Sequence, residues 1–128
     1  MVPQRRHQNQ LLFTTWNIRG LGTPIKRYKK YAQLKRRGSH IGFIQEMHLV
    51  REEGIKLQKK WRGQLFCTYY SSSRGVAIWV KAQVPFVAEE AKDPQGRYVL
   101  TRGRLDGLPL VLGSFIFPTQ INSCYLRR

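Results

Sequence analysis

Short apolar runs and one amphipathic stretch alternate along the first half of the chain. The runs Leu11–Trp16 and Ile41–Gln45 are apolar and β-branched, and such runs predict buried strands. Between them, Thr23-Pro24 is typical of a helix start, and Gly38 follows a basic stretch as a helix stop. The spacing within this helix predicts a face that packs on the core, formed by Ile25, Tyr28, Tyr31, Ala32 and the stem of Lys35.

The strand–helix–strand order predicts that the first two strands pair in parallel through a right-handed crossover. The carboxyl ends of parallel strands emerge at one edge of the sheet, where open α/β folds place their chemistry. Asn17 and Glu46 each directly follow the end of a predicted strand. We therefore expect their side chains to lie close together, beside a turn over residues 17–22 that contains two glycines.

Strand patterns dominate the second half of the chain. A weaker helix pattern covers Glu52–Trp61 and includes Gly54, which lowers helix propensity. Strands are expected over residues 65–70, 75–81, 86–90, 97–104 and 108–117, with turns at 71–74, 93–96 and 105–107. We interpret the chain as a flexible basic leader over 1–10, one α/β domain over 11–119 and a C-terminal tail over 120–128.

Charge is the most unusual feature of the composition. The 128 residues carry a formal net charge of +16, and 12 of the 23 basic residues lie between Lys26 and Arg62. Such a surplus favours a nucleic acid as partner, because neutralised phosphates release condensed counterions. An anionic membrane surface, or a charged face that only keeps the protein soluble, is the alternative.

Several classes of protein are excluded. A hydrophobic fraction of 41% excludes simple disorder. No apolar run reaches the roughly 20 residues of a membrane-spanning helix, and the polar start MVPQRRHQNQ is no secretory signal. We expect no membrane association by a spanning helix and an intracellular location, with the nucleus left open.

Glu46 and Asn17 are the strongest candidates for chemistry. A carboxylate at a strand end can hold Mg²⁺, a cation that prefers oxygen ligands. An Asn amide beside it can orient a phosphate or the carboxylate. The alternatives are a surface-loop Glu paired with a Lys or Arg, and an Asn selected because it tolerates a turn.

Other reactive side chains lack a partner pattern. The histidines have no second ligand at zinc spacing, so we expect no zinc site; they are His7, His40 and His48. We expect Cys67 and Cys124 to be inert thiols. The tryptophans are expected in the core rather than as base-stacking platforms; they are Trp16, Trp61 and Trp79. No phosphate-binding loop and no nucleophile elbow is present.

An ordered series of motifs resembles a known family. The segments are TWNIRGL at 15–21, PIKR at 24–27, IGFIQEMH at 41–48, GVAI at 75–78 and DPQGRY at 93–98. Together they resemble the endonuclease/exonuclease/phosphatase family, and most closely the apurinic-type endonuclease domain of LINE-type non-LTR retrotransposons. The resemblance runs from about residue 12 to residue 119.

The resemblance implies a fold, a reaction and a role for each matching residue. The fold would be a partial four-layer α/β sandwich, with the C-terminal half missing. Asn17 would orient the catalytic groups and phosphate, and Glu46 would bind Mg²⁺ or Mn²⁺. Gln45 and His48 would support Glu46. The activity would be metal-assisted hydrolysis of a DNA phosphodiester, with DNA contacts from Arg19, Lys26, Arg27 and His48.

The sequence also departs from the family pattern. Where the family carries a Tyr and an Asn in a Tyr-x-Pro-Asn-like motif, this chain has Ile116 and Thr119. The later Asp-x-Asn and Ser-Asp-His motifs, which supply the general base and a catalytic histidine, have no counterpart before Arg128. We therefore expect a truncated endonuclease domain that is inactive alone. A non-catalytic basic nucleic-acid-binding protein and a functionless retroelement remnant are the alternatives.

Overall fold

The computed structural model describes residues 11–69, 74–105 and 107–116, and the backbone of 122–127. Two helices and eight strands follow one another in the order β1 (Phe13–Asn17), α1 (Pro24–Arg36), β2 (Ile41–Gln45), α2 (Arg51–Lys60), β3 (Gln64–Thr68), β4 (Val76–Val80), β5 (Phe86–Lys92), β6 (Tyr98–Leu105), β7 (Leu108–Ile116) and β8 (Asn122–Arg127). Both predicted helices and every predicted strand are present, with shifted ends. The structure adds β8 within the segment that we assigned to a tail.

Several predicted features lie outside the described residues. They are the leader at 1–10, most of the polar turn at 71–74, Asp106 of the hairpin turn, Thr119, and the side chain of Cys124.

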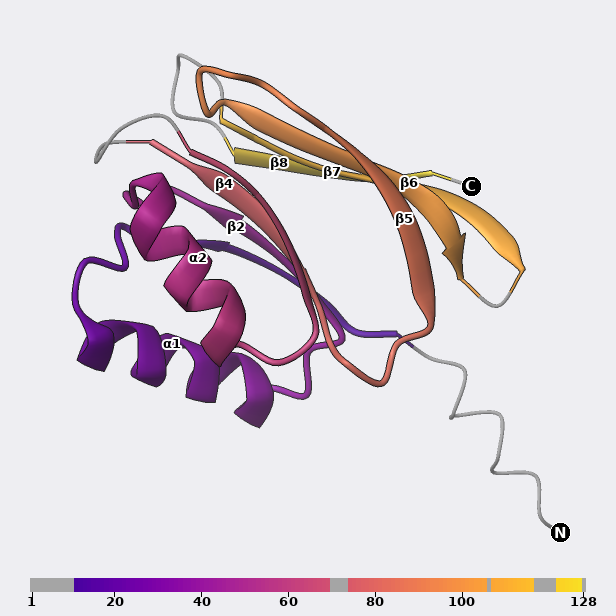
Figure 1. Cartoon of the computed structure of the whole chain (residues 1–128). Helices are drawn as coiled ribbons and strands as arrows, with labels where there is room; N and C mark the ends of the chain where they lie inside the picture. Colours follow the sequence, from indigo (N-terminus) through magenta and orange to yellow (C-terminus); the bar gives the residue numbers. More distant parts are fainter. Residues whose placement is uncertain (1–10, 70–73, 106, 117–121, 128) are drawn as a thin grey trace, which may run out of the picture.

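The strands form two four-stranded sheets. The first sheet has the order β1-β2-β4-β3, and β1 pairs with β2 in parallel, as predicted, from Phe13↔Ile41 to Asn17↔Gln45. The second sheet is an antiparallel meander of β5, β6, β7 and β8. Both helices cover one face of the first sheet and the second sheet covers its other face, so the described residues build three layers (Figure 1). None of the described helices is long and apolar enough to cross a membrane.

The core follows from this layering. All five residues of β4 are buried, as expected for a strand with both faces covered. Trp79 and Ala77 belong to the cluster beneath the helices, and Val76, Ile78 and Val80 belong to the cluster between the sheets. The first sheet is therefore fixed from both sides, and the residues at its edge are held by a rigid support.

The predicted inner face of α1 is wrong at three of its five positions. Ile25 and Tyr28 are 68% and 74% exposed, whereas Leu34 is fully buried. Lys35 is also exposed, and Tyr31 and Ala32 are partly buried. The reason is Arg27, a charged residue that the hydropathy pattern assigns to the exposed side of the helix. Its guanidinium donates to the carbonyl of Leu21 at 2.7 Å and to Glu53 at 2.8 Å. These bonds turn the side of Arg27, Tyr31 and Leu34 inward.

The ends of α1 follow the prediction. Thr23 is the N-cap, and its hydroxyl accepts a hydrogen bond from the Lys26 amide at 3.2 Å. Pro24 occupies the first helical position, and Gly38 adopts a left-handed φ of 71° after the last turn.

The core prediction holds for two of the three tryptophans, and the prediction of an inert thiol holds for Cys67. Trp61 and Trp79 are buried at 2% and 1% exposure. Trp16 is only partly buried, and its ring lies under the Lys30 ammonium at 4.7 Å. Cys67 is 1% exposed, and burial raises the pKa of its thiol to about 12. A thiol in this state is a poor nucleophile.

Candidate active site

Asn17 and Glu46 meet at the edge of the first sheet. Asn17 ends β1, Glu46 directly follows β2, and the parallel register pairs Asn17 with Gln45. The Asn17 amide Nδ2 donates to Glu46 Oε2 at 2.6 Å, which confirms the predicted proximity. The Asn17 Oδ1 accepts from the backbone amide of Arg19 at 3.2 Å, so the orientation of the amide group is set on both sides.

The loops after β1 and β2 continue the ladder of the strands. Backbone hydrogen bonds of 2.7–3.0 Å join the two loops and tie the second to the segment before β4; they are Ile18 N to Gln45 O, Gly20 N to Glu46 O, Leu21 N to Met47 O, and Met47 N to Gly75 O. The carboxylate of Glu46 is therefore carried by a loop whose backbone is held by hydrogen bonds on both sides.

The same loops hold unusual backbone conformations. Arg19, Glu46 and His48 have φ values of 55°, 56° and 55°, and no other non-glycine residue in the described ranges has a positive φ. Each such residue costs on the order of 1–3 kcal/mol, and strain of this kind clusters at functional sites. Gly20, with φ of 99°, accompanies them, and a Cβ there would lie 3.2 Å from His48 Nδ1.

A buried hydrogen bond supports the site from behind. Gln45 is fully buried, and its Nε2 donates to the Ser114 hydroxyl of β7 at 3.1 Å. Ser114 is fully buried too, and its hydroxyl reaches the carbonyl of Ile44 at 3.4 Å. The strand β2, which directly precedes Glu46, is thereby tied to the second sheet.

His48 lies beside the carboxylate. Its Nε2 is 3.5 Å from Glu46 Oε1, and the side chains of His48 and Glu46 are 30% and 28% exposed. Both groups are accessible to a ligand, while the neighbouring residues Gln45, Met47 and Leu49 are buried.

The remaining predicted nucleic-acid contacts differ in accessibility. Arg19 and Lys26 are exposed, whereas the Arg27 side chain is only 12% exposed and pairs with Glu53. Arg27 therefore links α1 to α2 through its ion pair with Glu53. Arg19 and Lys26 remain open to a phosphate.

The donor atoms fit Mg²⁺. This cation keeps several of its waters and needs only one or two protein carboxylates together with substrate phosphates. Glu46 supplies one partly exposed carboxylate, oriented by Asn17. Within the described ranges no three His, Cys, Asp or Glu side chains converge on a common point, so the donors here are those of Glu46 and its neighbours.

The turn between β5 and β6 reaches the same edge, which the sequence analysis did not anticipate. The Thr68 hydroxyl, at the end of β3, donates to the carbonyl of Asp93 at 2.6 Å. The Asp93 carboxylate accepts from Arg97 Nε at 2.6 Å and from the amides of Gln95 and Arg97. The Arg97 guanidinium holds the pKa of Asp93 below its usual value.

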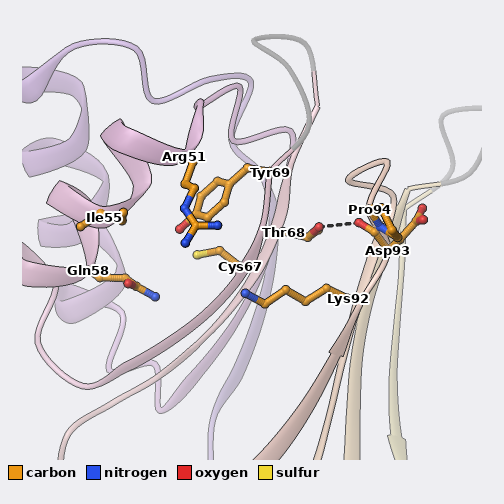
Figure 2. A pocket seen from close by; sticks show the side chains of 9 residues that line it. All are labelled: Arg51, Ile55, Gln58, Cys67, Thr68, Tyr69, Lys92, Asp93 and Pro94. Carbon is orange, nitrogen blue, oxygen red and sulfur yellow. Dashed lines mark hydrogen bonds between the residues drawn. The ribbon is translucent and has the colours of Figure 1, made fainter.

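A cleft opens between α2, β3 and this turn. Its volume is about 320 Å³, and its lining includes Arg51, Thr68, Tyr69 and Lys92 (Figure 2). The sequence contains one indication of a basic residue near this edge, because Arg51 follows Glu46 by only five positions.

Comparison with solved structures places the fold. The chain is similar to D. rerio TDP2 humanized by 14 mutations, with a TM-score of 0.58 and 19% sequence identity over 80% of this chain. TDP2 has the endonuclease/exonuclease/phosphatase fold. The chain spans 48% of the length of that structure, about half of it. No protein-family model matches the chain. The two sheets and two helices described here thus form a partial endonuclease/exonuclease/phosphatase-type fold.

Proposed function

We propose that this chain carries the metal-binding part of a phosphodiesterase site that acts on DNA, of the kind found in retrotransposon endonucleases. The observation that carries this proposal is the 2.6 Å hydrogen bond from Asn17 to Glu46 at the edge where two parallel strands end. The three left-handed residues around it and the motif resemblance from residue 12 to residue 119 support the same conclusion.

Each residue has a physical role in this proposal. Asn17 donates to Oε2 of Glu46 and so fixes the carboxylate, whose Oε1 lies 3.5 Å from His48 Nε2; Mg²⁺ or Mn²⁺ would bind this partly exposed carboxylate. Mg²⁺ held there would neutralise negative charge on the phosphate and on the leaving oxygen. His48 lies beside the carboxylate, and the exposed Arg19 donates its backbone amide to Asn17; the side chains of both would contact the phosphate.

The chain alone is proposed to bind metal and DNA without cutting. The resemblance assigns the general base and a catalytic histidine to motifs that have no counterpart in these 128 residues. Loss of such a group typically removes at least 10²-fold in rate. Supercoiled plasmid incubated with Mg²⁺ should therefore stay intact. Nicking that Glu46→Ala abolishes would refute this inactivity and at the same time support the metal site.

Metal binding tests the site itself. Calorimetric titration with Mn²⁺ should show binding to the wild type and at least 10-fold weaker binding to Glu46→Gln. Asn17→Ala should weaken binding by about 10–100-fold, as expected when a group that orients a ligand is lost. Glu52→Gln, which removes an exposed carboxylate of α2, is the matched control. Equal Mn²⁺ affinity in wild type and Glu46→Gln would refute the proposal.

A basic nucleic-acid-binding protein without catalysis is the second candidate, favoured by the net charge of +16. It predicts DNA affinity that falls steeply with salt but is indifferent to Mg²⁺ and to Glu46→Gln. A functionless remnant would show neither metal binding nor DNA binding.

A further inference from the structure

Two cationic side chains from distant segments share the cleft beside the candidate active site. Arg51 begins α2 and Lys92 ends β5, and their charged groups point from two sides into the cleft beside Cys67 (Figure 2). Arg51 is exposed and makes no ion pair within the described part of the chain. Two positive charges that converge from separate elements are suited to an anion.

The cleft lies on the same edge of the molecule as Glu46. β4 is antiparallel to both β2 and β3, so β2 and β3 run in the same direction and their carboxyl ends share one edge. In the order β2-β4-β3, two strand spacings separate those ends, which is about 10 Å. Consecutive phosphates of one DNA strand rise about 3.4 Å along the axis, and because the strand also winds around that axis they lie roughly 6–7 Å apart, so about one or two nucleotides span that separation.

The acidic neighbours do not cancel the positive charge. Asp93 lines the cleft, but its carboxylate is 6% exposed and turned into its own loop, where it pairs with Arg97. Glu90 lies 3.3 Å from the Lys92 ammonium. That pair is solvent-exposed, with Lys92 44% and Glu90 34% accessible, and such pairs contribute little. An incoming phosphate can therefore replace Glu90 as the partner of Lys92 at small cost.

We propose that this cleft is a second phosphate-binding position, in which Arg51 and Lys92 hold a backbone phosphate of the DNA strand about one or two nucleotides from the phosphate at Glu46. The inference rests on the proposed function for the identity of its ligand. This second contact would fix the position of the DNA strand along the edge of the first sheet. The phosphates at the two positions would then be held by separate elements of the fold.

The test is the salt dependence of binding. A fluorescein-labelled 12-base-pair DNA duplex is titrated with protein at 50–200 mM KCl, and affinity is read from anisotropy. Loss of two phosphate contacts in Arg51→Gln/Lys92→Gln should reduce the slope of log affinity against log salt by about 1.8. Over this fourfold salt range, that slope difference corresponds to an about 12-fold smaller loss of affinity than in the wild type.

A matched control removes the same charges elsewhere. Lys81→Gln/Arg104→Gln also replaces one Lys and one Arg, at the opposite edge of the sheets, where β4 and β6 end. This variant should keep the wild-type slope to within about 0.5. An unchanged slope in Arg51→Gln/Lys92→Gln, or an equal decrease in both double variants, overturns the inference. Should the double variant fail to fold by circular dichroism, Lys92→Gln alone should lower the slope by about 0.9.

Two further measurements distinguish failure of the proposed metal site from failure of the proposed phosphate position. Glu46→Gln should lose Mn²⁺ affinity yet keep the wild-type salt slope, so failure of the metal site and failure of the cleft give different results. Inorganic phosphate distinguishes the source of the anion. Phosphate binding that requires Arg51 and Lys92, with an unchanged DNA slope, would assign the cleft to a free phosphate and overturn its assignment to DNA.

Discussion

Leu34→Ala tests how α1 is seated on the strands that carry Asn17 and Glu46. Leu34 is the one fully buried side chain of the helix. Its Cδ2 lies 3.6 Å from the position that a Cβ would occupy on Gly42 of β2, so the leucine packs directly on the strand backbone. Alanine would leave a void between helix and sheet.

The magnitude follows from the atoms removed. Leucine to alanine deletes three carbons, each worth about 0.8 kcal/mol of transfer free energy, or roughly 2.4 kcal/mol together. The cavity left beneath a helix that cannot fully collapse adds to this, and we expect about 3–4 kcal/mol in total. A loss of that size is a large part of the 5–15 kcal/mol typical of a domain.

Urea unfolding followed by tryptophan fluorescence measures this loss. With a slope of about 1–3 kcal/mol per molar, the urea midpoint should fall by roughly 1–4 M. Ile25→Ala, at a position 68% exposed, is the control and should change the free energy of unfolding by no more than about 0.5 kcal/mol. If Ile25→Ala lowered the free energy of unfolding as much as Leu34→Ala, the helix face predicted from the hydropathy pattern would be the buried one, and the packing described here would be refuted.

Two further outcomes are expected. Gly54→Ala should destabilise the protein by about 1–2 kcal/mol, because the added methyl meets the ring of Tyr69, whereas Gly22→Ala, with open space around it, should be neutral in the same urea assay. Because the pKa of Asp93 is lowered in the folded protein, its ionised form contributes stability that is fully present above about pH 4 and is lost as pH falls through the lowered pKa. Asp93→Asn should therefore flatten the decline of stability in acid, and an unchanged acid limb of the pH–stability curve would contradict the Arg97 pair.

Local signals in the sequence determined much of the fold. The caps at Thr23 and Gly38 depend on backbone geometry within a few residues, and both are found where the sequence places them. The parallel pairing of the first two strands follows from chain order alone, because a strand–helix–strand crossover has few alternatives. The meeting of Asn17 and Glu46 is a consequence of that rule, so the centre of the candidate site was accessible without coordinates.

Other features depend on partners far away in the chain. The inner face of α1 is set by bonds from Arg27 to Leu21 and Glu53, and hydropathy cannot show that a charged residue finds such partners. The left-handed backbone of Arg19, Glu46 and His48 persists only because the joined loops hold it.

Tertiary structure alone decided the surroundings of the site. The strand β8 is recognised by its pairing with β7, and the pattern of its residues did not predict it. Arg51 and Lys92 are 41 positions apart in the sequence and share a cleft only because the second sheet folds over the first. Contacts of such separation are selected by the packing of whole layers, whereas sequence patterns report on the faces of single elements.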